Sequence, residues 1–296
     1  MEKSTCLINA STATDKRQRA TKYEMQLREE FVVEFARQFA PVTVRQVFYA
    51  ATVQKVVEKT EDGYNKIQSM CLQARRRGIL SYQWIADNSR TVYRLTSYDD
   101  LSNAADSFAS SYRRNFWSDF DYSAEVWLEK EALAGTILPV TKKYRVRLVP
   151  TRGYASETIL HSAVEQAHYE GKQKLYIFTL YDFDRSGQDA RAAVARGLEE
   201  MGRTMFGVEV DHRPIALTHQ QVMDMTLPSR PPKRTSGADK NWPYPIAVEL
   251  DAMPPDVLRG LVQAELEELM PDHFRRQVLA EETRERAKIR MALSEF

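Results

Sequence analysis

Residues 174–193, KLYIFTLYDFDRSGQDARAA, decide the fold, because an apolar run leads into two aspartates, a glycine and a helix-like segment. Apolar runs of this length are typical of strands buried on both faces of a parallel sheet. Strand alternation places Asp182 and Asp184 on the same side, at the strand end where open parallel sheets bind ligands. Two neighbouring carboxylates repel each other, and oxygen ligands of this kind predict a Mg²⁺ or Mn²⁺ ion between them.

Strand-like and helix-like segments alternate around this stretch. In chain order they are EVWLE (125–129), EALAGTILPV (131–140), YRVRLVPT (144–151), SETILHSAVEQAHYE (156–170), the stretch quoted above and VEVDHRPIAL (208–217). Such alternation predicts an α/β fold with a mostly parallel, Rossmann-like sheet covered on both faces. A loop rich in Pro, Ser and Lys (227–245) follows, and a helical C-terminal part begins near Pro254.

The N-terminal half has a different pattern. Apolar residues at helical spacing predict helices over 21–39, from Val44 to about 59 and over 64–77, and a β-like stretch follows over 79–95. Helix, helix, turn, basic helix and β ribbon is the order of a winged helix-turn-helix, whose second motif helix enters the major groove. We therefore divide the chain into a flexible N-terminus (1–20), a winged-helix DNA-binding domain (21–95), a connector (96–123) and an α/β domain (124–296).

Bulk properties exclude several classes of protein. A chain of 296 residues exceeds one ordinary hydrophobic core, so two domains are expected. No apolar run is long enough to cross a bilayer and the N-terminus has no secretory pattern, so we expect a cytoplasmic protein with no membrane partner. Cys6 and Cys71 fit neither a disulfide framework nor a zinc site. Although the net charge is only +1, basic residues gather in 66–94 and predict DNA contacts at Arg75, Arg76, Arg77 and Arg90.

A third carboxylate, Glu129, ends the first predicted strand of the α/β domain. The order of strand, Glu, then strand and Asp-x-Asp, with Gly187 after them, resembles the Toprim domain of topoisomerases, primases and certain nucleases. That resemblance implies that Glu129, Asp182 and Asp184 bind Mg²⁺, with Mn²⁺ as the alternative ion, beside a phosphodiester. Without it, the two aspartates would be interpreted as the cap of the following helix.

The segment TVRQVFY (43–49) extends the resemblance to the family of the topoisomerase VI A subunit and its meiotic double-strand-break relatives. The family's tyrosine motif places Tyr49 as the nucleophile that forms a 5′-phosphotyrosyl link. Arg45, one helical turn earlier, would hold phosphate or stabilise developing charge. The resemblance also implies an isomerase-type DNA transesterase that acts on double-stranded DNA as a homodimer.

Two departures from the family concern Arg185 and the length of the chain. Arg185 stands where the family has proline, and the short chain is similar to the stand-alone Mini-A proteins of phages and plasmids, which suggests a bacterial, phage or plasmid origin. Because the chain has no GxxxxGK[ST] loop, ATP would have to be handled by a separate B-type subunit.

Two other functions remain open at this point. In the first, the Toprim acids activate water, the protein is a metal-dependent endonuclease and Tyr49 is a structural core residue. In the second, the fold binds DNA without catalysis. Arginines in a run also commonly form a solvated helix face, and Glu249 and Asp251 either assist the metal site or mark a strand end before a helix.

Overall fold

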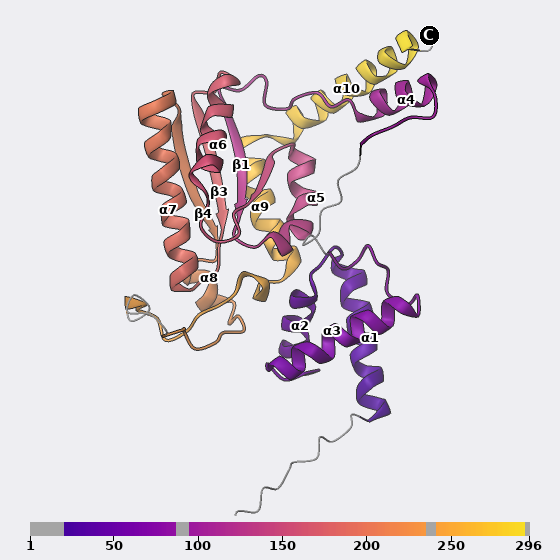
Figure 1. Ribbon diagram of the computed structural model, residues 1–296, viewed down its shortest axis with the longest axis vertical. Coiled ribbons are helices and arrows are strands. Elements are labelled where there is room, and N and C mark those ends of the chain that lie inside the picture. Colours follow the sequence, from indigo (N-terminus) through magenta and orange to yellow (C-terminus); the bar gives the residue numbers. More distant parts are fainter. Residues whose placement is uncertain (1–20, 87–94, 235–240, 294–296) are drawn as a thin grey trace, which may run out of the picture.

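The computed structural model describes residues 21–86, 95–234 and 241–293. A helical N-terminal part lies beside the carboxyl edge of an α/β part (Figure 1). The predicted flexible N-terminus and Arg90 lie outside the described residues. Within those ranges, no helix has the length and apolarity that crossing a membrane requires.

The N-terminal part contains three helices, α1 (Lys22–Phe39), α2 (Val44–Val53) and α3 (Glu61–Arg76). A threonine precedes each helix, and its side chain accepts a hydrogen bond from a backbone N–H of the first turn, which offsets the unpaired donors there. The second helix is shorter than predicted, because the backbone turns at Lys55 with a left-handed φ of 57°.

The predicted β ribbon after α3 is wrong for residues 79–86, which form turns. Their one backbone pairing is an isolated parallel bridge between Ile85 and Val42. Arg75 explains why this segment stays close to α3, since its guanidinium donates to the carbonyl oxygens of Tyr82 and Ile85. Three helices in the order expected for a winged helix are therefore present, and no wing is seen in the described residues.

The α/β part is built on four strands, β1 (Tyr122–Leu128), β2 (Arg147–Pro150), β3 (Lys174–Leu180) and β4 (Glu209–Ala216). Their spatial order is β2-β1-β3-β4 and all three pairings are parallel, which confirms the predicted α/β class and parallel sheet. Leu128 of β1 pairs with Pro150 and with Leu180, so three strands end at one edge.

Helices cover both faces of the sheet. On one side α5 (Ala134–Tyr144) packs against α9 (Pro255–Leu269), and on the other α6 (Glu157–Tyr169) packs against α7 (Arg185–Met201). Alternate strand residues enter two cores: Phe178 and Leu180 face the first, whereas Leu175 and Ile177 face the second. Because alternate residues of β3 point to opposite faces and both faces are buried, the sequence of β3 is a continuous apolar run.

The remaining elements join these layers. A helical connector, α4 (Leu101–Ser111), packs against the last helix, α10 (Asp272–Leu293). Arg114, which follows α4, forms an ion pair with Glu285 of α10. Shorter helical segments are η1 (Glu131–Leu133), the π-helix η2 (Gly202–Phe206), α8 (His219–Asp224) and η4 (Leu250–Ala252).

Candidate functional site

Glu129 and Asp182 meet where β1 and β3 end. The N–H of Glu129 donates to the carbonyl of Leu180, and Glu129 Oε2 accepts the N–H of Asp182 at 2.8 Å. Gly187 makes this approach possible, because a Cβ at that position would lie 2.9 Å from Glu129 Oε2 and 2.6 Å from the Asp182 carbonyl oxygen. The glycine of the motif is therefore required by the close contact between the start of α7 and the two strand ends.

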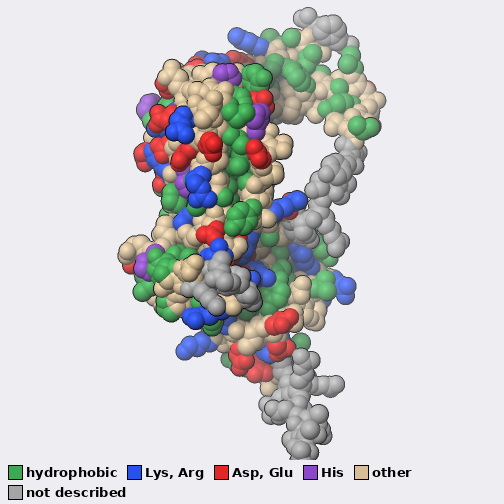
Figure 2. Space-filling view, turned by 60° about the vertical axis from the view of Figure 1, so that its left-hand side comes forward, with side chains coloured by type: hydrophobic (Ala, Val, Ile, Leu, Met, Phe, Trp, Pro, Cys, Tyr) green, Lys and Arg blue, Asp and Glu red, His purple; other side chains and the backbone are tan. Residues whose placement is uncertain are grey.

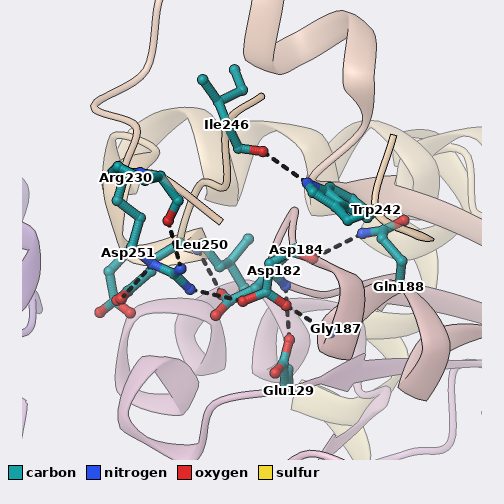
Figure 3. A network of polar contacts seen from close by, with 12 residues as sticks. Glu129, Asp182, Asp184, Gly187, Gln188, Arg230, Trp242, Ile246, Leu250 and Asp251 are labelled. Atoms are coloured by element: carbon teal, nitrogen blue, oxygen red, sulfur yellow. Dashed lines mark hydrogen bonds and ion pairs between the residues drawn. The ribbon is translucent and has the colours of Figure 1, made fainter. Parts of the chain in front are cut away.

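Asp184 lies beside them and caps α7. Its Oδ1 accepts the N–H of Gly187 at 2.9 Å, and its Oδ2 lies 2.8 Å from Arg230 Nη2 (Figure 3). The interpretation of Asp184 as the cap of α7 is thus correct for its Oδ1. The other oxygen faces the same cluster as Glu129 and Asp182, so the side chain serves both arrangements.

Asp182 connects the strand ends to a third segment. Its Oδ1 accepts the N–H of Leu250 at 2.7 Å, while its Oδ2 lies 3.0 Å from Lys130 Nζ. The same ammonium contacts Glu249 at 3.2 Å and Asp251 at 3.0 Å. The acidic cluster therefore consists of five carboxyl groups from three segments, namely Glu129, Asp182, Asp184, Glu249 and Asp251.

Three cationic side chains lie among these five acids, namely Lys130, Arg45 and Arg230. Burial raises the pKa of Glu129 to about 7, and the nearby charge of Asp182 acts in the same direction. Burial also raises the pKa of Asp182, although Lys130 opposes it. Burial would raise the pKa of Glu249 as well, but Lys130 and Arg45 outweigh it and lower that pKa to about 2. Burial and the neighbouring acid thus dominate at Glu129, whereas the neighbouring cations dominate at Glu249.

The chemistry of the donors suits a hard divalent cation, since all five side chains present carboxylate oxygens. Their arrangement is less suitable: in the described part of the chain no three Asp, Glu, His or Cys side chains converge on a metal position. Asp182 is engaged by Lys130 and the N–H of Leu250, and Asp184 by Arg230 and the cap of α7. The predicted trio thus lies together, with both oxygens of Asp182 and of Asp184 already engaged.

Arg45 and Tyr49 come to this cluster from the helical part. Arg45 Nη1 lies 2.7 Å from Glu249 Oε2, and its guanidinium lies over the ring of Tyr64. Tyr49 is one turn further along α2, with only 7% of its surface exposed, and burial raises the pKa of its hydroxyl to about 12. The predicted nucleophile is therefore close enough to feel the charges of Glu249 and Arg45, but it is largely covered.

A groove of about 1240 Å³ separates the helical part from the sheet edge. One wall is formed by α3 and the start of α2, and the other carries the acidic cluster. Lys and Arg side chains gather at this junction (Figure 2), and those that line the groove are Arg45, Arg75, Lys130, Arg152, Arg230 and Lys233. Tyr49 lines a separate, mostly apolar groove between α1, α2 and the start of α9.

The predicted DNA-contacting arginines are placed differently from one another. Arg75 lines the groove but is engaged by backbone carbonyls, and Arg77 pairs with Glu29 away from the groove lining. Arg76 is exposed, outside the groove lining. Lys130, Arg230 and Lys233 were not predicted from the sequence. The available signals were that Lys130 directly follows Glu129 and that Arg230 and Lys233 lie in a proline-rich loop.

The site thus combines a cluster of carboxyl groups at the ends of parallel strands with a groove that carries cationic side chains. No protein-family model, no curated protein and no solved structure matches this chain. The function must accordingly be judged from the geometry and charge of the site, with the topoisomerase VI A resemblance as a prediction from short motifs.

Proposed function

We propose that this protein cleaves double-stranded DNA in a Mg²⁺-dependent or Mn²⁺-dependent reaction of the topoisomerase VI A type. The observation that carries the proposal is the groove, which has the predicted recognition helix α3 on one wall and the acidic cluster on the other. A duplex bound along α3 would present its phosphates to that cluster. In this proposal the winged-helix and Toprim domains are the DNA-binding and metal-binding halves of one site.

Charge supports the substrate class. Arg152 and Lys233 line the groove outside the acidic cluster and, together with Arg230 beside Asp184, can attract phosphate oxygens. The five carboxyl groups outnumber the three cations among them, so the charge of a divalent ion can be accommodated there. When bound, such an ion would neutralise a phosphodiester and stabilise the departing oxygen.

The proposed nucleophile is Tyr49. Its phenolic oxygen would attack phosphorus, the bond to the 3′ oxygen would break, and the DNA would remain joined through a 5′-phosphotyrosyl ester. The phenolic proton goes to a base and the 3′ oxygen gains a proton. Because burial raises the pKa of Tyr49 to about 12, the hydroxyl must become exposed or gain a cationic neighbour before it reacts. Arg45 lies one turn away and already acts against the raised pKa.

A second candidate is a nuclease in which water is the nucleophile. The burial of Tyr49 and its absence from the lining of the main groove favour this mechanism. In that case Glu129, whose pKa burial raises to about 7, is suited to accept a proton near neutral pH. Both candidates use the same groove and the same acids.

The proposed partners follow from the family resemblance. A homodimer would let the tyrosine of one protomer work with the acidic cluster of the other, and a separate B-type subunit would supply ATP hydrolysis. In the arrangement described here, Arg45 of the tyrosine-bearing helix contacts Glu249 within one chain. The dimer proposal therefore requires that Arg45 of one protomer contact Glu249 of the other instead.

Trapping of protein-linked DNA tests the proposal. Supercoiled DNA is incubated with the protein and Mg²⁺, denatured with detergent and separated with and without protease digestion. We expect strand breaks whose 5′ ends are bound to protein in the wild type, and neither breaks nor adducts in Tyr49→Phe. Breaks with free 5′ ends in both proteins would select the nuclease. Absence of breaks in the wild type with Mg²⁺ or Mn²⁺, alone or with an ATPase partner, would contradict both.

A further inference from the structure

Lys130 occupies the centre of the acidic cluster. Its Nζ lies 3.0 Å from Asp182 Oδ2, 3.2 Å from Glu249 Oε2 and 3.0 Å from Asp251 Oδ2. An ammonium group carries three N–H donors, so three carboxylate neighbours use its full capacity. Asp182 follows the end of β3, Glu249 precedes η4 and Asp251 lies within η4. Lys130 therefore contacts acids from two separate segments.

Three further oxygens of the cluster also have internal donors. Asp182 Oδ1 accepts the N–H of Leu250, Glu129 Oε2 accepts the N–H of Asp182, and Asp251 Oδ1 accepts the hydroxyl of Thr43 at 3.2 Å. A hard cation that binds these oxygens, or those that face Lys130, must therefore compete with an existing partner. Lys130 is the partner whose loss frees oxygens on three acids at once.

We propose that Lys130 is the resident cation of the acidic cluster, and that a divalent ion binds there by exchange with its ammonium group. This inference rests on the proposed function, because it concerns the same carboxylates. It also accounts for the absence of a convergent metal position in the described residues, since the carboxylates are arranged around an ammonium. The protein would then hold its acids together without a metal, and the side chain released on exchange would be free to contact phosphate.

The exchange predicts competition between Lys130 and metal. If the ammonium fills the cluster in most molecules, only a small fraction is competent to bind a divalent ion, and the apparent affinity is reduced by that fraction. Removing the ammonium should raise the affinity. Removing a nearby cation that does not contact the carboxylates should change it much less, because screening weakens a charge acting at a distance.

Lys59 provides the matched control. Burial lowers the pKa of Lys59, and the charge of Glu249 is near enough to influence it. Its ammonium nevertheless donates to the carbonyl oxygen of Ser229, and no carboxylate of the described residues lies within ion-pair distance of it. Lys59→Gln therefore removes the same charge from the neighbourhood, while Lys130→Gln removes it from the centre. Lys130→Arg keeps the charge at the centre.

The test is Mn²⁺ binding to DNA-free protein, measured by electron paramagnetic resonance after circular dichroism has shown that each variant is folded. We expect Lys130→Gln to bind Mn²⁺ about tenfold more tightly than the wild type, and Lys130→Arg and Lys59→Gln to stay within about threefold of it. Equal or weaker binding by Lys130→Gln would overturn the exchange and leave the proposed function standing. Absence of Mn²⁺ binding in all four proteins would overturn both.

A second measurement needs no variant. Wild-type protein is acetylated briefly with and without saturating Mn²⁺, and modified lysines are identified by mass spectrometry. Exchange predicts that Mn²⁺ increases acetylation of Lys130 several-fold and leaves the exposed Lys142 unchanged. Acetylation of Lys130 that stays constant or falls when Mn²⁺ binds would contradict the exchange even if Lys130→Gln failed to fold.

Discussion

Arg45 Nη1 lies 2.7 Å from Glu249 Oε2, and this ion pair attaches the helix that carries Tyr49 to the acidic cluster of the same chain. Thr43 reinforces the contact, because its hydroxyl donates to Asp251 Oδ1 at 3.2 Å. The helical part is thus held to the sheet edge by charged groups that DNA phosphates and divalent ions would also contact. Binding of either should therefore alter how α2 sits on the cluster.

Glu249 should make stability depend on acid pH. Its ionic partners lower its folded-state pKa to about 2, below the ordinary value of 4.5, so its contribution is present above pH 4.5 and is lost as pH falls toward 2. We expect the unfolding free energy of Glu249→Gln, measured in urea, to fall less steeply than that of the wild type between about pH 4.5 and pH 2.5. Parallel curves for the two proteins would contradict the ion pairs.

Glu129 should change the pH dependence of the unfolding free energy in the opposite direction. Burial and Asp182 raise its folded-state pKa to about 7, so the folded protein binds a proton that the unfolded chain has lost, and stability falls as pH rises from 4.5 through 7. Glutamine keeps an acceptor for the Asp182 N–H. Without metal, we expect Glu129→Gln to be more stable than the wild type by about 1 to 3 kcal/mol at pH 8 and by less at pH 5. Urea unfolding at the two pH values checks this, and a less stable variant at pH 8 would contradict it.

Gly187 should tolerate no larger side chain. A Cβ there would meet the Asp182 carbonyl oxygen at 2.6 Å and Glu129 Oε2 at 2.9 Å, so Gly187→Ala must shift the start of α7 and should cost about 1 to 3 kcal/mol. Gly260 in α9 is the control, because a Cβ meets nothing within 4 Å. Gly260→Ala should add about 0.5 to 1 kcal/mol through helix propensity. Urea unfolding of both variants checks the pair, and equal effects would contradict the close approach.

Lys233 should contribute to DNA affinity through a phosphate contact. It is exposed and lines the groove, so Lys233→Ala should weaken binding to every sequence and reduce the salt slope by about one unit. Arg203, which follows α7 at the end remote from Asp184, provides a basic control outside the groove. Fluorescence anisotropy of labelled duplex DNA at several salt concentrations gives both slopes. If the salt dependence of DNA affinity had the same slope for Lys233→Ala and Arg203→Ala, DNA would not bind in the groove.

Much of the α/β part was predictable because its strands are local apolar runs with helices between them. The pattern predicted β3 and α7 correctly, and it put Glu129 and Asp182 at the ends of two strands, which the structure shows to be neighbours. Parallel pairing follows from such alternation, since each crossover helix returns the chain to the same edge.

The remaining features depend on contacts between distant segments. Lys130 meets Glu249 and Asp251 across more than a hundred residues, and no periodicity encodes that meeting. Burial of Tyr49 likewise arises from packing of α2 against α1 and η4. The predicted β stretch after α3 has a strand-like composition, but Arg75 binds its backbone carbonyls within residues 79–86 and competes with pairing there.

The most direct measurement is cleavage of supercoiled DNA by Asp182→Asn in the presence of Mg²⁺, with Glu131→Gln as the control. Glu131 lies on the same groove wall but pairs with Arg152 outside the acidic cluster. If the cluster carries the reaction, Asp182→Asn should lose cleavage by about a hundredfold or more, and Glu131→Gln should stay close to the wild type. Cleavage by Asp182→Asn at the wild-type rate would contradict the proposed function of the site.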